Sequence, residues 1–264
     1  MFIEILNKIK EYNRIIIHRH MRPDGDCMGS QMGLKYLLKN SFPDKEIYAV
    51  GDGVPSYLQE LGEVDNIPDE YYNDALVIVV DTSVDKRIYD DRWKTGKYII
   101  KIDHHDDSPD FGNLCYVDET CPACSAIIVR MIKAWGEEVK ICPKAAYALY
   151  FGIVTDTGRF RYRGLTSEVL NNAGYLLDLG IDVDTLYNKL YVDVYYNEDM
   201  VKPIFSSKEK AYEYARFMEL QDLEILVLTD EISLSIKQFV LKSEICPKSV
   251  ILKVLYVILG LTNT

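Results

Sequence analysis

The chain has 264 residues, of which 48% are hydrophobic and 27% charged, and its formal net charge at pH 7 is −11. This composition is that of a globular protein, and the length allows one large domain or two of ordinary size. The acidic balance argues against an extended nucleic-acid surface, which would need basic stripes. It leaves a short anionic substrate open, because bound divalent cations reverse the field of an acidic cleft.

Neither end of the chain resembles a membrane or export segment. Residues 1–11 carry charge in every turn, and the apolar run 250–261 is too short to cross a bilayer. We therefore expect a cytoplasmic protein that contacts no membrane and whose six cysteines are free thiols. Cys121 and Cys124 have redox or zinc-like spacing, but no second pair lies nearby, so we interpret both as buried residues at a helix start.

Strand-like and helix-like segments alternate over the first 180 residues. Helical spacing of apolar residues covers 2–12, a strand is expected at 14–18, and a helix follows to about residue 40. A short strand at 47–50 precedes a loop-rich region at 52–70. Further strands are expected at 75–80 and 98–102, and further helices at 123–135, 143–154 and 167–179. This alternation predicts an α/β domain with a mainly parallel sheet flanked by helices.

The C-terminal part has a different character. Residues 182–199 are acidic and rich in tyrosine, which indicates a connecting helix or linker. A helical stretch at 207–218 and a strand at 223–228 follow. We expect a domain at 1–185, a linker helix at 186–200, and a small, incomplete α/β domain at 201–264, near the lower size limit for independent folding.

Polar clusters follow three of the predicted parallel strands directly. They are His20, Asp24 and Asp26 after the first strand, Asp81 after the strand at 75–80, and Asp103, His104 and His105 after the strand at 98–102. Parallel sheets bind ligands beyond the carboxyl ends of their strands, so these clusters should meet. Each aspartate on its own could simply cap a helix or close a turn. Carboxylates gathered at one sheet edge repel one another unless a cation lies among them.

The residue types indicate a metal site. Aspartate and histidine together suit Mn²⁺, Zn²⁺ or Fe²⁺, whereas carboxylates alone would suit Mg²⁺. The candidate ligands, which outnumber the needs of one ion, are His20, Asp24, Asp26, Asp81, His104 and Asp156. Two ions that share a carboxylate would use all of them, and such sites suit the hydrolysis of phosphate esters. His18 points to the opposite face of its strand and is expected in the core.

Four motifs occur in order: His20-x-x-Pro23-Asp24-x-Asp26-x-x-Gly29-Ser30, the strand-terminal Asp81, Asp103-His104-His105, and the segment 152–160, Gly-Ile-Val-Thr-Asp-Thr-Gly-Arg-Phe. Together they closely resemble the DHH phosphoesterase family, and within it the oligoribonuclease and pAp-phosphatase branch (nanoRNases, RecJ-like). The resemblance covers about residues 12–185.

The resemblance implies two Mn²⁺ ions, with Mg²⁺, Co²⁺ or Fe²⁺ as substitutes. The first ion would be held by His20, Asp24 and Asp81. The second would be held by Asp26, Asp81, His104 and Asp156, with Asp81 as the shared ligand.

It also implies the roles of the remaining site residues. Asp103 would orient a neighbouring imidazole, and His105 would face the scissile phosphate, with Asp81 completing the catalytic set. His105 and Arg159 would contact the substrate. The implied reaction cleaves short oligonucleotides (nanoRNA, pApA) to nucleoside 5′-monophosphates and pAp to AMP.

The resemblance is incomplete at the C-terminus. Members of this branch carry a substrate-binding DHHA1 domain with a Gly-Gly-Gly-His segment, whereas here no histidine follows His105 and Gly260 is the only glycine after Gly180. We expect a truncated domain, with a divergent cap or a homodimer contact as the alternative. Either would impair turnover, because the grip on the substrate orients the reacting centre.

Three other functions stay open on the sequence: a cyclic-dinucleotide phosphodiesterase, a pyrophosphatase, and a catalytically impaired metal- or nucleotide-binding protein. The choice between RNA and DNA, the preferred substrate and the oligomeric state also stay open.

Overall fold

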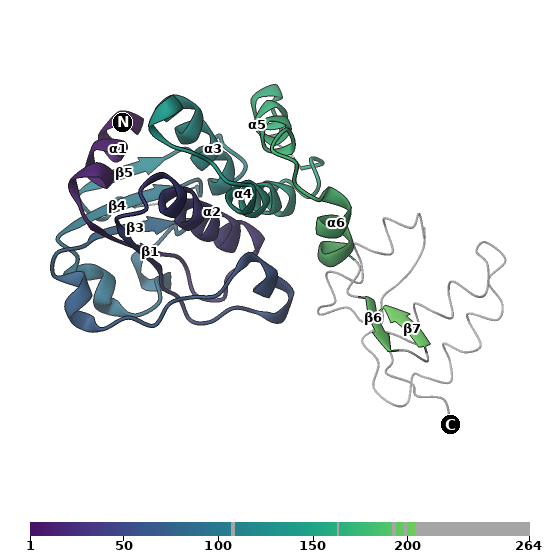
Figure 1. Cartoon of the computed structure of the whole chain (residues 1–264), viewed down its shortest axis with the longest axis horizontal. Helices are drawn as coiled ribbons and strands as arrows, with labels where there is room; N and C mark the ends of the chain where they lie inside the picture. The colour runs from purple at the N-terminus through teal and green to yellow at the C-terminus, as the bar shows by residue number, and fades with distance from the viewer. Residues whose placement is uncertain (107–108, 163, 192–193, 198–199, 204–264) are drawn as a thin grey trace. The chain divides into compact units, whose positions relative to one another are not determined.

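The structure, a computed structural model, describes residues 1–106, 109–162, 164–191, 194–197 and 200–203 (Figure 1). The chain divides into two compact units, Met1–Asp182 and Val183–Thr264. The helix expected at 207–218 and the strand expected at 223–228 lie outside the described residues. The domain boundaries expected from the sequence therefore stay predictions.

The first unit is built on one parallel sheet, as the sequence predicts. Its strands are β1 (Arg14–His18), β2 (Glu46–Ala49), β3 (Leu76–Val80), β4 (Tyr98–Asp103) and β5 (Leu114–Val117). They lie in the order β2-β1-β3-β4-β5, and every neighbouring pair is parallel. Each residue of β3 is buried, which is why this strand reads as a continuous apolar run without alternation.

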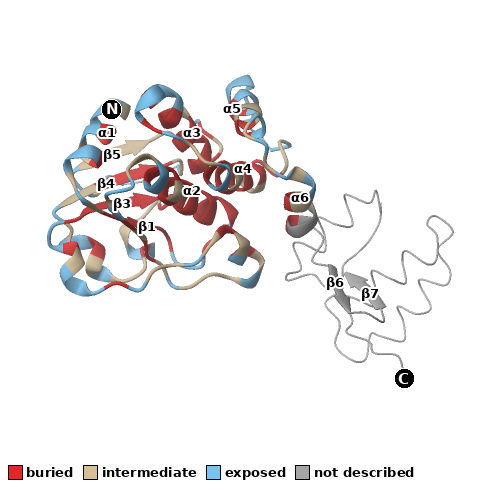
Figure 2. Ribbon diagram, viewed as in Figure 1, coloured by how far each residue is buried: buried red, intermediate tan, exposed pale blue. Residues whose placement is uncertain are grey.

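Five α-helices accompany the sheet in this unit: α1 (Phe2–Glu11), α2 (Gly25–Ser41), α3 (Cys124–Trp135), α4 (Pro143–Asp156) and α5 (Ser167–Leu177). α2 contacts β1, β2 and β3 on one side and α4 on the other. Buried residues accordingly run through the strands and through α2 and α4 (Figure 2). The helix that begins at the metal motif is thus enclosed by the protein core.

The helix ends follow local signals in the sequence. Asp24 caps α2 by accepting a hydrogen bond from the Cys27 amide, and Thr166 caps α5 by accepting one from the Val169 amide. Pro143 occupies the first turn of α4, where its missing N–H costs nothing. α4 continues two residues beyond the predicted end at Val154, so Asp156 is its last helical residue.

Three features differ from the expectations. β5 was not predicted, because its four residues are all only partly buried at the sheet edge and carry a weak pattern. The second strand begins one residue earlier than expected. The connecting region between β2 and β4 forms short 3₁₀ helices: Ser56–Leu61, Asp69–Tyr72, Asp85–Arg87 and Asp91–Thr95. A fifth, Gly136–Glu138, follows α3.

The second unit begins with α6 (Val183–Tyr191) and continues into the antiparallel strands β6 (Val194–Asn197) and β7 (Met200–Pro203). The prediction of a helix across 186–200 is therefore wrong for residues 194–197 and for Met200, which lie in strands. The β-branched and aromatic run Val194-Tyr195-Tyr196 favours a strand, and this local preference outweighs the acidic character on which the prediction rested. Among the residues described, no helix has the length and apolarity needed to cross a membrane.

Candidate metal centre

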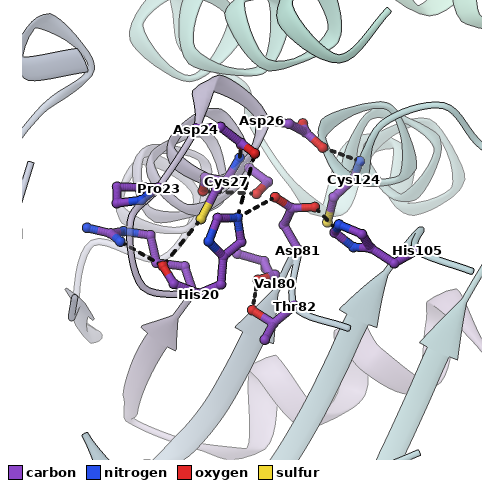
Figure 3. Close-up of polar contacts among 12 residues, drawn as sticks. His20, Pro23, Asp24, Asp26, Cys27, Val80, Asp81, Thr82, His105 and Cys124 are labelled. Atoms are coloured by element: carbon purple, nitrogen blue, oxygen red, sulfur yellow. Dashed lines mark hydrogen bonds and ion pairs between the residues drawn. The ribbon is translucent and has the colours of Figure 1, made fainter. Parts of the chain in front are cut away.

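The predicted site residues meet where the parallel strands end (Figure 3). His20 follows β1, Asp81 follows β3, and His104 and His105 follow β4. The N-terminus of α2 supplies Asp24 and Asp26, and the last residue of α4 supplies Asp156. Because the strands are parallel, the carboxyl ends of β1, β3 and β4 lie at one edge of the sheet, as expected from the sequence.

Asp26 is held by the N-terminus of a second helix. Its side chain is completely buried and accepts hydrogen bonds from the amides of Cys124 (2.5 Å) and Ser125 (2.9 Å) at the start of α3. These amides have no partner within their own helix, and the helix dipole favours negative charge there. The contact fixes one carboxylate between α2 and α3.

Asp81 lies between two imidazoles. One carboxylate oxygen, Oδ2, is 3.5 Å from His20 Nε2, and the other, Oδ1, is 3.3 Å from His104 Nε2. The residue is buried and adopts a φ of +49°, a left-handed conformation that is unusual for a non-glycine residue and is often found at functional sites. Asp81 is thus positioned to serve two neighbouring sites.

Both histidines that face Asp81 point Nε2 toward carboxylates. His20 Nδ1 lies 2.8 Å from the Met21 carbonyl and 3.3 Å from Arg87 Nη2, and His104 Nδ1 lies 3.1 Å from the Cys121 carbonyl. In each ring the carbonyl is the nearest partner of Nδ1. A carbonyl only accepts hydrogen bonds, so in a neutral ring Nδ1 carries the proton and Nε2 presents a lone pair. A lone pair facing carboxylates is repulsive in the absence of a cation, and this is the tautomer of a metal-ligating histidine.

A second group of donors surrounds His104. Its Nε2 is 3.2 Å from Asp156 Oδ2 and 3.7 Å from Asp26 Oδ2. One donor atom from each of Asp26, His104 and Asp156 can be chosen so that all three lie within 4.8 Å of one another, a spacing that fits a metal ion. The same holds for Asp81, His104 and His105.

The donors also lack partners that the protein itself could supply. Among the described residues, His20 Nε2 and Asp81 Oδ1 are buried and form no hydrogen bond. Burying polar atoms that form no hydrogen bond costs free energy unless another group, such as a metal ion, binds them. The chemistry of the donor set and these unsatisfied atoms together fit divalent cations.

Electrostatics lead to the same conclusion. Burial raises the pKa of Asp26 well above its usual value, and the charges of Asp81 and Asp156 raise it further. Burial lowers the pKa of His104, but the neighbouring carboxylates of Asp156, Asp81 and Asp26 outweigh burial and leave that pKa raised. The cluster therefore carries an excess of negative charge that attracts cations.

His105 and Asp103 form a separate pair beside the cluster. His105 Nδ1 donates to Asp103 Oδ1 over 2.8 Å, and this bond raises the pKa of the His105 imidazole. Asp103 is fully buried, with Lys101 Nζ 3.7 Å from its Oδ2, whereas the His105 side chain is one-third exposed. Since Nδ1 is engaged, Nε2 is the ring nitrogen left to meet a substrate.

The other predicted residues have different surroundings. Asp24 is the most exposed candidate ligand, with 60% of its side chain accessible and Oδ2 3.8 Å from His20 Nε2. Arg159 lies in the turn after α4 with a φ of +63°, and its contact with substrate stays a prediction. His18 is buried in the core, as expected, with Nε2 2.8 Å from the Tyr72 hydroxyl.

Sequence reasoning assigned no role to Cys27, which the structure places at the centre. Its Sγ can be grouped with donor atoms of His20 and Asp81 within 4.8 Å of one another. Its position directly after Asp26 in the first turn of α2 is its only sequence signal, and that position does not distinguish a ligand from a packing residue. The Cys121 and Cys124 thiols are free and buried, as expected, and donate to the carbonyls of Ala123 and Ile102.

With this geometry established, similarity to known proteins identifies the family. Residues 14–153 match the family model described as DHH family, N-terminal domain. The chain belongs to the DHH family. The probable bifunctional oligoribonuclease and PAP phosphatase of Streptococcus mutans is 44% identical over 189 residues, which cover 72% of this chain and 60% of that protein.

A second curated relative and a solved structure are also similar to this chain. The bifunctional oligoribonuclease and PAP phosphatase of Bacillus subtilis is 42% identical over 194 residues, covering 72% of this chain and 61% of that protein. The crystal structure of an exopolyphosphatase-related protein from Bacteroides fragilis matches with a TM-score of 0.63 and 26% identity, over 72% of this chain and 59% of the other. The chain thus spans about 60% of the length of the curated relatives it matches.

Proposed function

We propose that this DHH protein is a metal-dependent phosphoesterase that hydrolyses short oligoribonucleotides to nucleoside 5′-monophosphates and pAp to AMP. The observation that carries the proposal is the position of Asp81, whose two carboxylate oxygens face two imidazoles on opposite sides. The names of the Streptococcus mutans and Bacillus subtilis relatives support the substrate class. The net charge of −11 supports a short substrate over extended nucleic acid.

The proposal keeps the two ligand sets that the family resemblance implies. His20, Asp24 and Asp81 would hold one ion, and Asp26, Asp81, His104 and Asp156 the other. Imidazole ligands favour Mn²⁺ or Fe²⁺ over Mg²⁺. Bound there, the two ions would supply Lewis-acid polarisation of the phosphate oxygens and a water of lowered pKa.

His105 would act on the substrate itself. Asp103 fixes the orientation of its ring and stabilises its protonated form, so that Nε2–H can donate to a phosphate or leaving-group oxygen. Hydrolysis breaks one P–O ester bond, the water oxygen forms a new P–O bond that is not an ester, and the departing oxygen takes up a proton. The His105 side chain is one-third exposed, so a phosphate could reach its ring without a large movement of the chain.

The experiment incubates the full chain with Mn²⁺ and pApA, pAp, a cyclic dinucleotide or pyrophosphate, and measures both product and bound metal. Asp81→Asn removes the shared ligand charge. Asp74→Asn is the matched control, because Asp74 lies near the other end of β3 and its side chain is 84% exposed. We expect AMP from pApA and pAp, and a loss of metal and at least about a hundredfold loss of activity in Asp81→Asn only.

Other outcomes separate the alternatives. Turnover of the cyclic dinucleotide alone would favour the chemistry named in a Geobacillus thermodenitrificans relative, a cyclic-di-AMP phosphodiesterase that is 27% identical over 194 residues. Two bound ions with no product from any substrate would favour a catalytically impaired metal-binding protein. Full metal content and activity in Asp81→Asn would contradict the shared-ligand assignment.

A further inference from the structure

The Cys27 thiol lies at the metal centre without a role in the proposed reaction. Cys27 stands in the first turn of α2, directly after Asp26, and its side chain is completely buried. Its Sγ lies 3.8 Å from the His20 carbonyl oxygen. Figure 3 marks this contact with a dashed line. That hydrogen bond uses the S–H proton and leaves the sulfur lone pairs unused.

Two buried donor atoms beside this thiol have no hydrogen-bond partner among the described residues. His20 is 1% exposed, and within the described part of the chain its Nε2 forms no hydrogen bond; the same is true of Asp81 Oδ1. One donor atom from each of His20, Cys27 and Asp81 can be chosen so that all three lie within 4.8 Å of one another. An imidazole nitrogen, a carboxylate oxygen and a thiol therefore converge in a buried space.

His20 also has a carboxylate neighbour, which is a hard donor in the sense of hard and soft metal ligands. Asp24 Oδ2 lies 3.8 Å from His20 Nε2 on a side chain that is 60% exposed and whose other oxygen, Oδ1, accepts from the Cys27 amide. Carboxylates prefer hard ions such as Mn²⁺ and Mg²⁺, whereas thiolates select softer ions such as Zn²⁺. His20 and Asp81 thus have an oxygen donor and a sulfur donor available to the same ion.

We propose that Cys27 determines metal specificity: with His20 and Asp81 it binds soft divalent ions, whereas Asp24 completes the site for hard ions. On coordination the S–H bond is lost, sulfur becomes a thiolate ligand, and the proton passes to solvent. The inference rests on the proposed metal centre and adds a donor to it. It predicts that Cd²⁺ and Zn²⁺ compete effectively with Mn²⁺ for the His20 side of the centre.

The test uses Cd²⁺ and Co²⁺ as probes, because thiolate coordination gives each a ligand-to-metal charge-transfer absorption that nitrogen and oxygen ligands do not. The full chain is titrated with each ion, and bound metal is measured alongside the spectrum. Cys27→Ser keeps the size of the side chain, and Cys27→Ala removes the donor. Cys142→Ser is the matched control. Cys142 lies just before α4, at the opposite end of that helix from Asp156, and its thiol contacts the Tyr36 carbonyl.

We expect the absorption in the wild type and in Cys142→Ser and its loss in both Cys27 variants. Cd²⁺ affinity should fall at least about tenfold in the Cys27 variants, the scale of effect seen when a metal site loses a supporting group, while Mn²⁺ affinity is unchanged. Asp24→Asn should show the reverse, with weakened Mn²⁺ binding and the thiolate absorption retained.

Two results would overturn the proposal, and they differ in what else they affect. Bound Cd²⁺ without a thiolate absorption, or an absorption that survives in Cys27→Ala, would remove Cys27 from the site and leave the metal centre intact. Failure of the wild type to bind any of the divalent ions would overturn the metal centre, and this inference would fall with it.

Discussion

At the scale of single residues, the site separates groups suited to hold ions from groups suited to handle a proton. Three of the six candidate ligands, His20, Asp26 and Asp81, are buried, and burial of carboxylates beside one another raises the pKa of Asp26 and Asp156. His105 is instead partly exposed and is oriented by a buried carboxylate. This difference in exposure would let the neighbouring histidines His104 and His105 have the different roles proposed for them.

The role of His105 can be tested by substitution. His105→Gln removes the proton donor but keeps a polar side chain, and we expect kcat on pApA to fall by about a hundredfold or more. Metal content should stay at the wild-type level, because His20, His104 and the aspartates remain. Rate and bound metal are measured on the same sample, and a rate within a fewfold of the wild type would contradict the assignment.

Much of the site could be predicted at this scale, because every predicted ligand directly follows a strand or opens or ends a helix. Cys27 could not, since a cysteine in a buried helix is usually a packing residue and only the folded geometry brings its sulfur near His20 and Asp81. The tautomers of His20 and His104 also required the structure, because they depend on the carbonyls of Met21 and Cys121.

At the scale of elements, close contact among α2, α3 and α4 positions Asp26. A Cβ on Gly152 of α4 would overlap Ser125 Oγ and come within 2.7 Å of Asp26 Oδ1. A Cβ on Gly29 of α2 would lie 2.6 Å from the Ala148 carbonyl oxygen. These glycines allow the helices to approach closely enough for the α3 amides to hold the carboxylate.

Gly152→Ala tests this packing. We expect it to lower the free energy of unfolding by about 1–3 kcal/mol, the usual cost of overpacking, and to weaken metal binding by displacing Asp26. The matched control is Gly174→Ala in α5, where nothing lies within 4 Å of the new Cβ; it should stabilise by about 0.4–1 kcal/mol. Urea unfolding measures the stability of both variants. A Gly152→Ala protein that is as stable as the wild type and binds as much metal would refute the packing argument.

The elements themselves show what a sequence pattern resolves. β1 was predicted with correct bounds, and β3 and β4 to within one residue at either end, because buried parallel strands are apolar throughout and end at polar turns. β5 was missed because an edge strand of four partly buried residues has no such contrast. The strand β6 was missed because acidic and tyrosine-rich composition carries no clear period.

At the scale of the whole molecule, the acidic net charge and the parallel sheet have one common consequence. The topology places the ends of β1, β3 and β4 side by side, so carboxylates distant in the sequence accumulate at one edge. The chain as a whole has 41 acidic against 30 basic residues, so its net charge of −11 does not offset them, and divalent ions would do so. The central claim is that two such ions share Asp81.

The most direct measurement of this claim is anomalous diffraction at the manganese absorption edge from crystals of the full chain grown with Mn²⁺. The account predicts two anomalous peaks about 3.5–4 Å apart, one on the His20 side of Asp81 and one on the His104 side. Crystals of Asp81→Asn should lose at least one of them. A single peak or none in the wild type, or two peaks distant from Asp81, would contradict the account.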